Sequence, residues 1–194
     1  MNCPLRNVVI SKLSFQLQLL FFLLGSCLPY ACFATPTVAT EYQVKAAFLY
    51  NFANFISWPS TAFTDSTQTF QVCIFGTDPF EEVLDNLLKN QNAKDRKIKA
   101  VRLLNTATIN NCHILFIGQS AQIQLEDLLA LLDSYSVLTV SDIPDFVLRG
   151  GMIEFFTVDN KIRLAINPDK LEAAGMKADA NLLRLSKIMR PLRD

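Results

Sequence analysis

The sequence of 194 residues is poor in histidine, the side chain that general acid–base catalysis uses most often. It contains a single histidine, His113, and few cysteines, so the His and Cys ligands that zinc prefers are scarce. His113 directly follows Cys112, and neighbours along a strand point to opposite faces of the sheet. The two side chains are therefore not placed to act as a Cys–His nucleophilic pair, and we predict a buried structural histidine.

Glycine is also scarce, at six residues, and the glycine patterns of nucleotide and ester chemistry are missing. The strand-to-helix turn FGTDPF (residues 75–80) lacks the second and third glycines that let a backbone approach a pyrophosphate. No G-x-S-x-G sequence offers a nucleophile elbow. We therefore predict a protein that is not an enzyme and uses no cofactor or metal, and a binding or regulatory module becomes the leading class.

Neither sign of charge is in excess, since 18 basic residues balance 18 acidic ones. This balance gives no reason to expect nucleic acid as a partner. Lys97, Lys99 and Arg102 are interpreted as the solvated face of a strand. Glu81 and Glu82 suit the first turn of a helix, where acidic side chains interact favourably with the helix dipole.

The first 34 residues have the pattern of a secretory signal peptide. Arg6 and Lys12 are the only charged residues before Glu41, and they precede the apolar run LQLLFFLLG. Small residues then lead to Ala34, after which we place the cleavage. The mature domain would cover residues 35–194, and the protein would be periplasmic.

Two other interpretations of this amino-terminal region stay open. Residues 15–34 are about long enough to be an uncleaved membrane anchor. The sequence LGSC, ending at Cys27, loosely resembles a lipoprotein processing site.

Removal of residues 1–34 leaves two of the five cysteines, Cys73 and Cys112. In an oxidising compartment two such cysteines are most simply a disulfide. The alternative is a pair of free, buried thiols, which their apolar surroundings would also tolerate.

The mature chain alternates helical and strand patterns. Thr40 and Gln43 form a capping-box pattern before a Phe-rich helix that Trp58-Pro59 should end, and its apolar stripe is interpreted as core. That stripe contains Val44, Ala47, Phe48, Phe52, Phe55 and Ile56. Further helices are predicted over residues 78–90, with Asp78 as N-cap, and 122–135, and strands over residues 70–76, 97–104, 112–118 and 136–142.

The last part of the chain has a different pattern. Residues 150–168 predict two strands joined at Asp159-Asn160, and residues 167–190 predict one or two helices punctuated by Gly175. The predicted fold is a single-domain α/β sandwich. It has a mostly parallel sheet with helices on both faces and a C-terminal β-hairpin plus helix.

The ordered motifs of residues 41–190 resemble the YfiR-like family of periplasmic repressors. The matching stretches are EYQVKAAFLYNFANFISWP, CIFG, CHILFIG, GGMIEF, IRLAIN and AAGMKADANLLRLSKIMR. The resemblance implies a homodimer that binds the periplasmic sensor region of an inner-membrane diguanylate cyclase and lowers cyclic-di-GMP signalling and biofilm formation. It also implies that an OmpA-like outer-membrane lipoprotein can sequester the repressor.

The resemblance assigns individual residues as well. Cys73 and Cys112 match the family's structural disulfide, whereas a second pair found in some members falls near Val147 and Glu154, and neither is cysteine. The resemblance also implies a partner or ligand patch near the last hairpin, at Ile153, Ala165 and Leu171.

The alternative function is a periplasmic small-molecule binding protein that serves a transporter or a sensor kinase.

Overall fold

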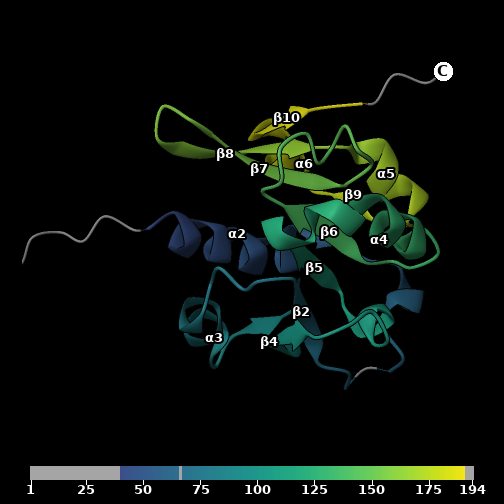
Figure 1. Ribbon diagram of the computed structural model, residues 1–194. Helices are drawn as coiled ribbons and strands as arrows, with labels where there is room; N and C mark the ends of the chain where they lie inside the picture. The colour runs from purple at the N-terminus through teal and green to yellow at the C-terminus, as the bar shows by residue number, and fades with distance from the viewer. Residues whose placement is uncertain (1–39, 66, 191–194) are drawn as a thin grey trace, which may run out of the picture. The chain divides into compact units, whose positions relative to one another are not determined.

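The computed structural model describes residues 40–65 and 67–190 of the protein (Figure 1). The predicted signal peptide, residues 1–34, lies outside these residues, as does the start of the predicted mature domain. The described part is an α/β fold around an eight-stranded sheet, in the order β10-β8-β7-β6-β5-β2-β4-β3. A smaller sheet joins β1 and β9.

Five neighbouring strands of the large sheet are parallel, and the sheet becomes mixed towards both edges. The parallel strands are β4 (Arg96–Leu103), β2 (Phe70–Phe75), β5 (Ile114–Ile117), β6 (Leu138–Ser141) and β7 (Ile153–Val158). The remaining strands are β8 (Lys161–Ile166), antiparallel to β7, β10 (Ser186–Ile188), parallel to β8, and β3 (Asn92–Ala93), antiparallel to β4. The small sheet pairs β1 (Ile56–Ser57) with β9 (Lys177–Ala178).

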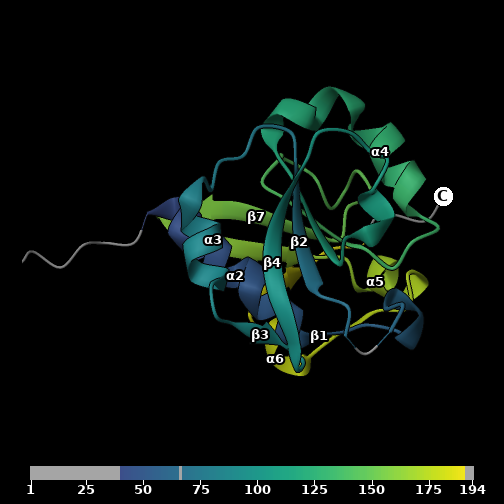
Figure 2. The ribbon, with the colours of Figure 1, turned by 90° about the horizontal axis from the view of Figure 1, so that it is seen from below.

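Helices cover both faces of the large sheet, as the sequence predicted (Figures 1 and 2). Successive residues of β2 point to opposite faces: Val72 and Ile74 join the cluster under α2 and α3, whereas Cys73 and Phe75 join the cluster under α4. The helices are α2 (Glu41–Phe55), α3 (Glu82–Leu88), α4 (Leu125–Leu132), α5 (Pro168–Ala173) and α6 (Ala180–Arg184), with short 3-10 turns η1 (Ser60–Ala62), η2 (Ile109–Asn111) and η3 (Gln119–Gln124).

The first described helix begins as predicted and ends slightly early. The Thr40 N–H donates to Gln43 Oε1 at 2.7 Å, and the Gln43 N–H donates to Thr40 Oγ1 at 3.4 Å, which completes the capping box. The helix ends at Phe55, before Trp58-Pro59, because Ile56 and the following residue pair with β9.

The prediction that the second helix starts at Asp78 was wrong. Asp78 Oδ1 accepts the N–H of Phe80 at 2.8 Å, and Glu81 has a positive φ of 49°, so α3 starts at Glu82. Phe80 is buried, with its ring 5.5 Å from Tyr42 and 4.8 Å from Phe116. The ring of Phe80 is buried between the helix α2 and the sheet. Its burial holds the residues before Glu82 in a turn, where the local pattern indicated helix.

The end of the chain also differs from the prediction of helices alone. The hairpin of β7 and β8 forms at Asp159-Asn160, where both residues have the positive φ of a type I′ turn. After α5 and α6, however, residues 186–188 form β10 along the outer edge of β8, and the Met189 N–H donates to Ile166 O at 2.9 Å. The open edge of β8 therefore determines the structure of this segment, in place of its helical pattern.

Candidate functional site

The place where open parallel sheets usually bind a ligand is filled by protein in this fold. The order β4-β2-β5-β6-β7 is that of a doubly wound sheet, whose ligand crevice lies beyond the carboxyl ends of β2 and β5. Here the Thr77 N–H donates to Ser120 Oγ at 2.7 Å. A Cβ on Gly76 would lie 2.6 Å from Ser120 Oγ, and one on Gly118 would lie 2.8 Å from Thr77 O. The two loops thus pack directly against each other.

A cavity of about 350 Å³ lies further along the same edge of the sheet. It is bordered by the first turns of α2, by the loops that follow β5 and β6, and by the middle of β7. Side chains that line it include Glu41, Lys45, Asp142, Asp145 and Glu154.

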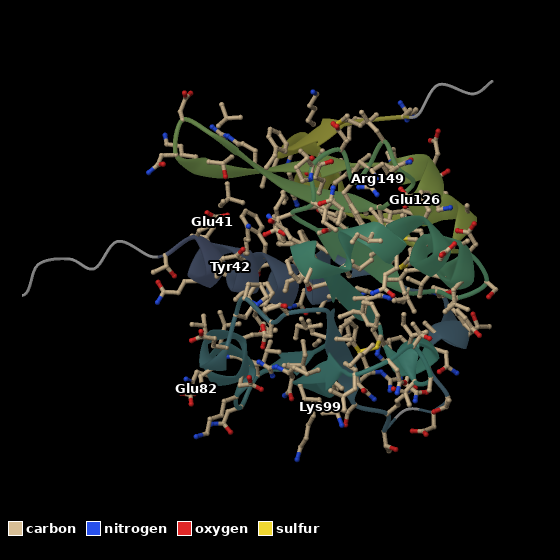
Figure 3. All side chains as sticks on the ribbon, viewed as in Figure 1. Glu41, Tyr42, Glu82, Lys99, Glu126 and Arg149 are labelled. Atoms are coloured by element: carbon tan, nitrogen blue, oxygen red, sulfur yellow. A yellow bond between two sulfur atoms is a disulfide. The ribbon has the colours of Figure 1, made fainter. Side chains whose placement is uncertain are left out.

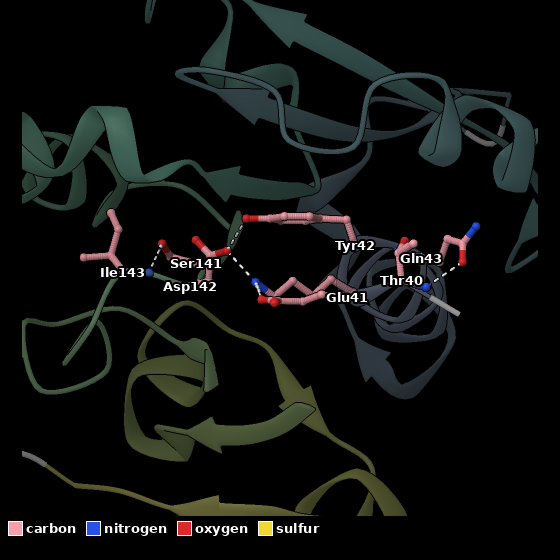
Figure 4. A network of polar contacts seen from close by, with 8 residues as sticks. Thr40, Glu41, Tyr42, Gln43, Ser141, Asp142 and Ile143 are labelled. Atoms are coloured by element: carbon pink, nitrogen blue, oxygen red, sulfur yellow. Dashed lines mark hydrogen bonds and ion pairs between the residues drawn. The ribbon is translucent and has the colours of Figure 1, made fainter. Parts of the chain in front are cut away.

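A polar cluster, drawn in Figure 4, contributes Glu41, Lys45 and Asp142 to the lining of this cavity. Lys45 is only 2% exposed, and its Nζ lies 2.5 Å from Asp142 Oδ2 and 2.5 Å from Glu41 Oε1. The Tyr42 hydroxyl donates to the same Asp142 oxygen at 3.1 Å. Ser141 fixes the turn beside them, because its Oγ donates to Ile117 O and accepts the Ile143 N–H.

The electrostatics of the cluster keep its protons in place. Burial lowers the pKa of Lys45, but its hydrogen bonds to Asp142 and Glu41 outweigh this effect, and the net pKa is raised. Burial and the Asp142 carboxylate raise the pKa of Tyr42 as well. Both groups stay protonated at neutral pH, so the cluster is a fixed ion pair that joins α2 to β6 and is not suited to general acid–base chemistry.

Sequence reasoning missed this cluster. Lys45 and Asp142 are separated by 97 positions, and only the fold brings them together. One signal was present: Lys45 is the only charged residue in α2 after Glu41, among apolar neighbours that should be buried. In the residues that the structure describes, no group of three or more His, Cys, Asp or Glu side chains is placed to hold a metal ion.

The outer side of α2 carries a second candidate surface, which we call the outer α2 face: Gln43, Val44, Ala47, Phe48 and Asn51. These residues line a shallow hollow of about 290 Å³ and include no charged side chain. The prediction that the apolar stripe is core holds for Phe52 and Ile56, which are fully buried. It was wrong for Phe55, which is 41% exposed at the end of the same helix.

The predicted disulfide is present in the structure. Cys73 on β2 is bonded to Cys112, just before β5, with a Cα–Cα distance of 5.8 Å. The two strands are parallel neighbours, and both cysteines are buried beneath α4. Neither cysteine lines the cavity, and the bond links two neighbouring inner strands of the sheet.

The three residues of the predicted partner patch lie inside the protein. Ile153, Ala165 and Leu171 are 0%, 1% and 1% exposed, and Ile153 and Leu171 belong to the core under α2. The end of the β7–β8 hairpin that holds Ile153 and Ala165 is buried on both faces, and Leu171 packs inward from α5, so these side chains offer no surface to a partner here.

The basic residues of β4 are partly solvated, as expected. Lys99 points away from the fold (Figure 3), and Lys97 is also exposed. Arg102 differs, because its guanidinium contacts Asp78 at 2.7 Å and Asp85 at 2.6 Å and so ties β4 to α3.

His113 is a structural residue, as predicted. It is 1% exposed, its ring stacks on Phe63 and Phe70 at 4.6 Å each, and its Nδ1 accepts the Gln71 N–H at 3.1 Å. Burial, aided by the charge of Arg96, lowers the pKa of His113 from 6.5 to about 4.

This histidine should make stability depend on pH. Between pH 6.5 and 4 the unfolded chain binds a proton at His113 that the folded protein does not, so stability falls as the pH is lowered. The full loss corresponds to about 3 kcal/mol. We expect urea titrations to show this loss on acidification, and to show a smaller loss in His113→Asn, whose amide can still accept the Gln71 N–H. Equal losses in the two proteins would contradict the assignment.

Comparison with known protein families finds a match over most of the chain. The model of the YfiR/HmsC-like family matches residues 42–187. The chain belongs to the YfiR/HmsC-like family. A search of curated proteins finds no match.

Membership of the YfiR/HmsC-like family indicates a periplasmic regulator of diguanylate cyclase, in a family that is regulatory and not catalytic. Among the described residues, no helix is both long and apolar enough to span a membrane. For a YfiR/HmsC-like protein the surfaces of interest are those that a protein partner can reach, and the outer α2 face is one of them.

Proposed function

We propose that this protein represses a membrane-bound diguanylate cyclase by binding the periplasmic sensor region of that enzyme, which lowers cyclic-di-GMP output. The family match over residues 42–187 carries the proposal. Residues 1–34 serve as the export signal, and the Cys73–Cys112 disulfide suits an oxidising compartment. The same proposal includes a homodimer and sequestration by an OmpA-like outer-membrane lipoprotein.

The outer α2 face supports repression by direct contact. It has no charged side chain, and it includes the partly exposed Phe48, whose ring lies 5.9 Å from that of Phe155. Large aromatic side chains in a desolvated, uncharged setting are typical anchors of protein interfaces. We assign this face to the contact with the cyclase.

Deletion of the gene should raise cyclic-di-GMP and biofilm formation, and the wild-type protein should restore both. Ala47→Glu places a charge in the hollow of the outer α2 face and should fail to restore repression, because the charge must lose its water when the interface forms. Asn86→Glu, on the exposed side of α3, is the matched control and should restore it. Nucleotide extracts quantified by mass spectrometry, with periplasmic protein levels, provide the measurement.

The cavity of about 350 Å³ favours the second candidate, a small-molecule binding protein that serves a transporter or a sensor kinase. The deletion distinguishes the two functions. Unchanged cyclic-di-GMP together with failure of a neighbouring uptake system would support the second and contradict repression.

A further inference from the structure

The strand β7 continues past the end of its neighbour β6. The two strands pair only through Val140 with Ile153 and Ser141 with Glu154, after which β6 stops while β7 runs on to Val158. Figure 1 shows the β7–β8 hairpin extending beyond β6. In the part of the chain that the structure describes, no strand pairs with residues 155–158 on this side.

The hairpin register shows which backbone groups this edge presents. The Asn167 N–H donates to Met152 O, so the even-numbered residues of β7 exchange hydrogen bonds with β8. The N–H and C=O groups of the odd-numbered Phe155 and Thr157 therefore point away from β8. Both residues line the cavity of about 350 Å³, which places their backbone groups along its wall.

We call the free edge of β7 at residues 155–157, together with the cavity beside it, the notch. The rim of this notch is acidic. Glu41, Asp145 and Glu154 line it, and Lys45 is already bound to Glu41 and Asp142. Glu154 is only 9% exposed, and one of its carboxylate oxygens accepts the Val147 N–H at 3.1 Å. The carboxylates outnumber the single ammonium, so the notch favours a positively charged occupant.

We propose that an extended segment of the partner, carrying Lys or Arg, adds to β7 at residues 155–157 as an extra strand in line with β6. An unpaired strand edge is a template for backbone hydrogen bonds with another chain, and the acidic rim selects a basic segment. A second copy of this chain is disfavoured, because its own β7 edge would bring the same carboxylates together. The identity of the partner rests on the proposed function, according to which the partner is the periplasmic sensor region of the cyclase.

Thr157→Pro tests the backbone contact. It removes the N–H that faces the notch, and it breaks no bond to β8, because the odd-numbered residues make none. Thr157→Ala is the matched control, since it removes the same side chain and keeps the N–H. In the deletion strain, Thr157→Pro should leave cyclic-di-GMP at the deletion level and Thr157→Ala should restore repression, at equal periplasmic amounts. Repression by Thr157→Pro equal to wild type would overturn the inference.

A second arm needs no cyclase and so separates this inference from the proposed function. An array of eight-residue peptides, with Lys at alternate positions and random residues between, is probed with the purified mature protein. We expect binders whose affinity falls at least tenfold with Thr157→Pro, falls with Asp145→Asn, and is lost on N-methylation of the peptide backbone. If no peptide binds the wild-type protein, or if Thr157→Pro binds equally well, the inference is wrong, whatever the deletion does to cyclic-di-GMP.

Discussion

Replacement of Cys73 and Cys112 by Ala is expected to lower the free energy of unfolding by about 4 kcal/mol. The bond closes a loop with a sequence separation of 39 residues, and the chain-entropy model assigns such a loop about this value. Domains of this kind have net stabilities of about 5–15 kcal/mol, so the loss is a large share of the total. Denaturant titration of the two proteins, monitored through Trp58, measures it.

Reduction of the wild-type protein provides the matched control for this double variant. A reductant should destabilise the wild type by about the same amount and leave the double variant unchanged, because only the wild type has a bond to lose. In the periplasm the reduced protein should be degraded faster and cyclic-di-GMP should rise. A double variant as stable as the oxidised wild type would show that the bond adds nothing to the fold.

Lys45→Met is expected to lower the free energy of unfolding by about 3–5 kcal/mol, the range found when one partner of a buried ion pair is removed. The Asp142 side chain is only 6% exposed, and without the ammonium its carboxyl group would be left buried with the Tyr42 hydroxyl as its remaining side-chain partner. The loss of the pair should also loosen the attachment of α2 to β6. Denaturant titration and hydrogen exchange of the α2 amides would measure the two effects.

Glu41→Gln provides the comparison for Lys45→Met. It removes a carboxylate from the same ammonium, but the Glu41 side chain is 52% exposed, so the loss should stay below about 1 kcal/mol. The double variant Lys45→Met/Asp142→Leu should recover most of the stability, because no unpaired charge remains buried. If Lys45→Met costs no more than Glu41→Gln, the cluster does not stabilise the fold.

Features that depend on residues close together were predictable from the sequence. The capping box of α2 needs only Thr40 and Gln43, and the hairpin needs only Asp159-Asn160 between two alternating runs. The buried strands were predictable because their apolar runs are continuous, as expected for strands covered on both faces. The family motifs and the pair of cysteines follow from the same local information.

Two of the mispredicted elements show how distant contacts outweigh local preference. The start of α3 is delayed by burial of Phe80 between Tyr42 and Phe116, residues that its own neighbourhood does not contain. Residues 186–188 have a helical pattern, yet they become β10, because hydrogen bonds to the open edge of β8 are available only once that strand is in place.

By itself, then, the sequence determined the class of fold, the disulfide partners, the family and the lack of the usual catalytic motifs. The tertiary structure decided which side chains are buried and which are exposed. It buried Ile153, Ala165 and Leu171, and among the described residues it left the hollow of the outer α2 face unfilled. The Lys45–Asp142 pair joins residues 97 positions apart. The notch exists only because β7 continues beyond the point where its pairing with β6 ends. Both depend on strand order and register, which are set by contacts across the whole chain.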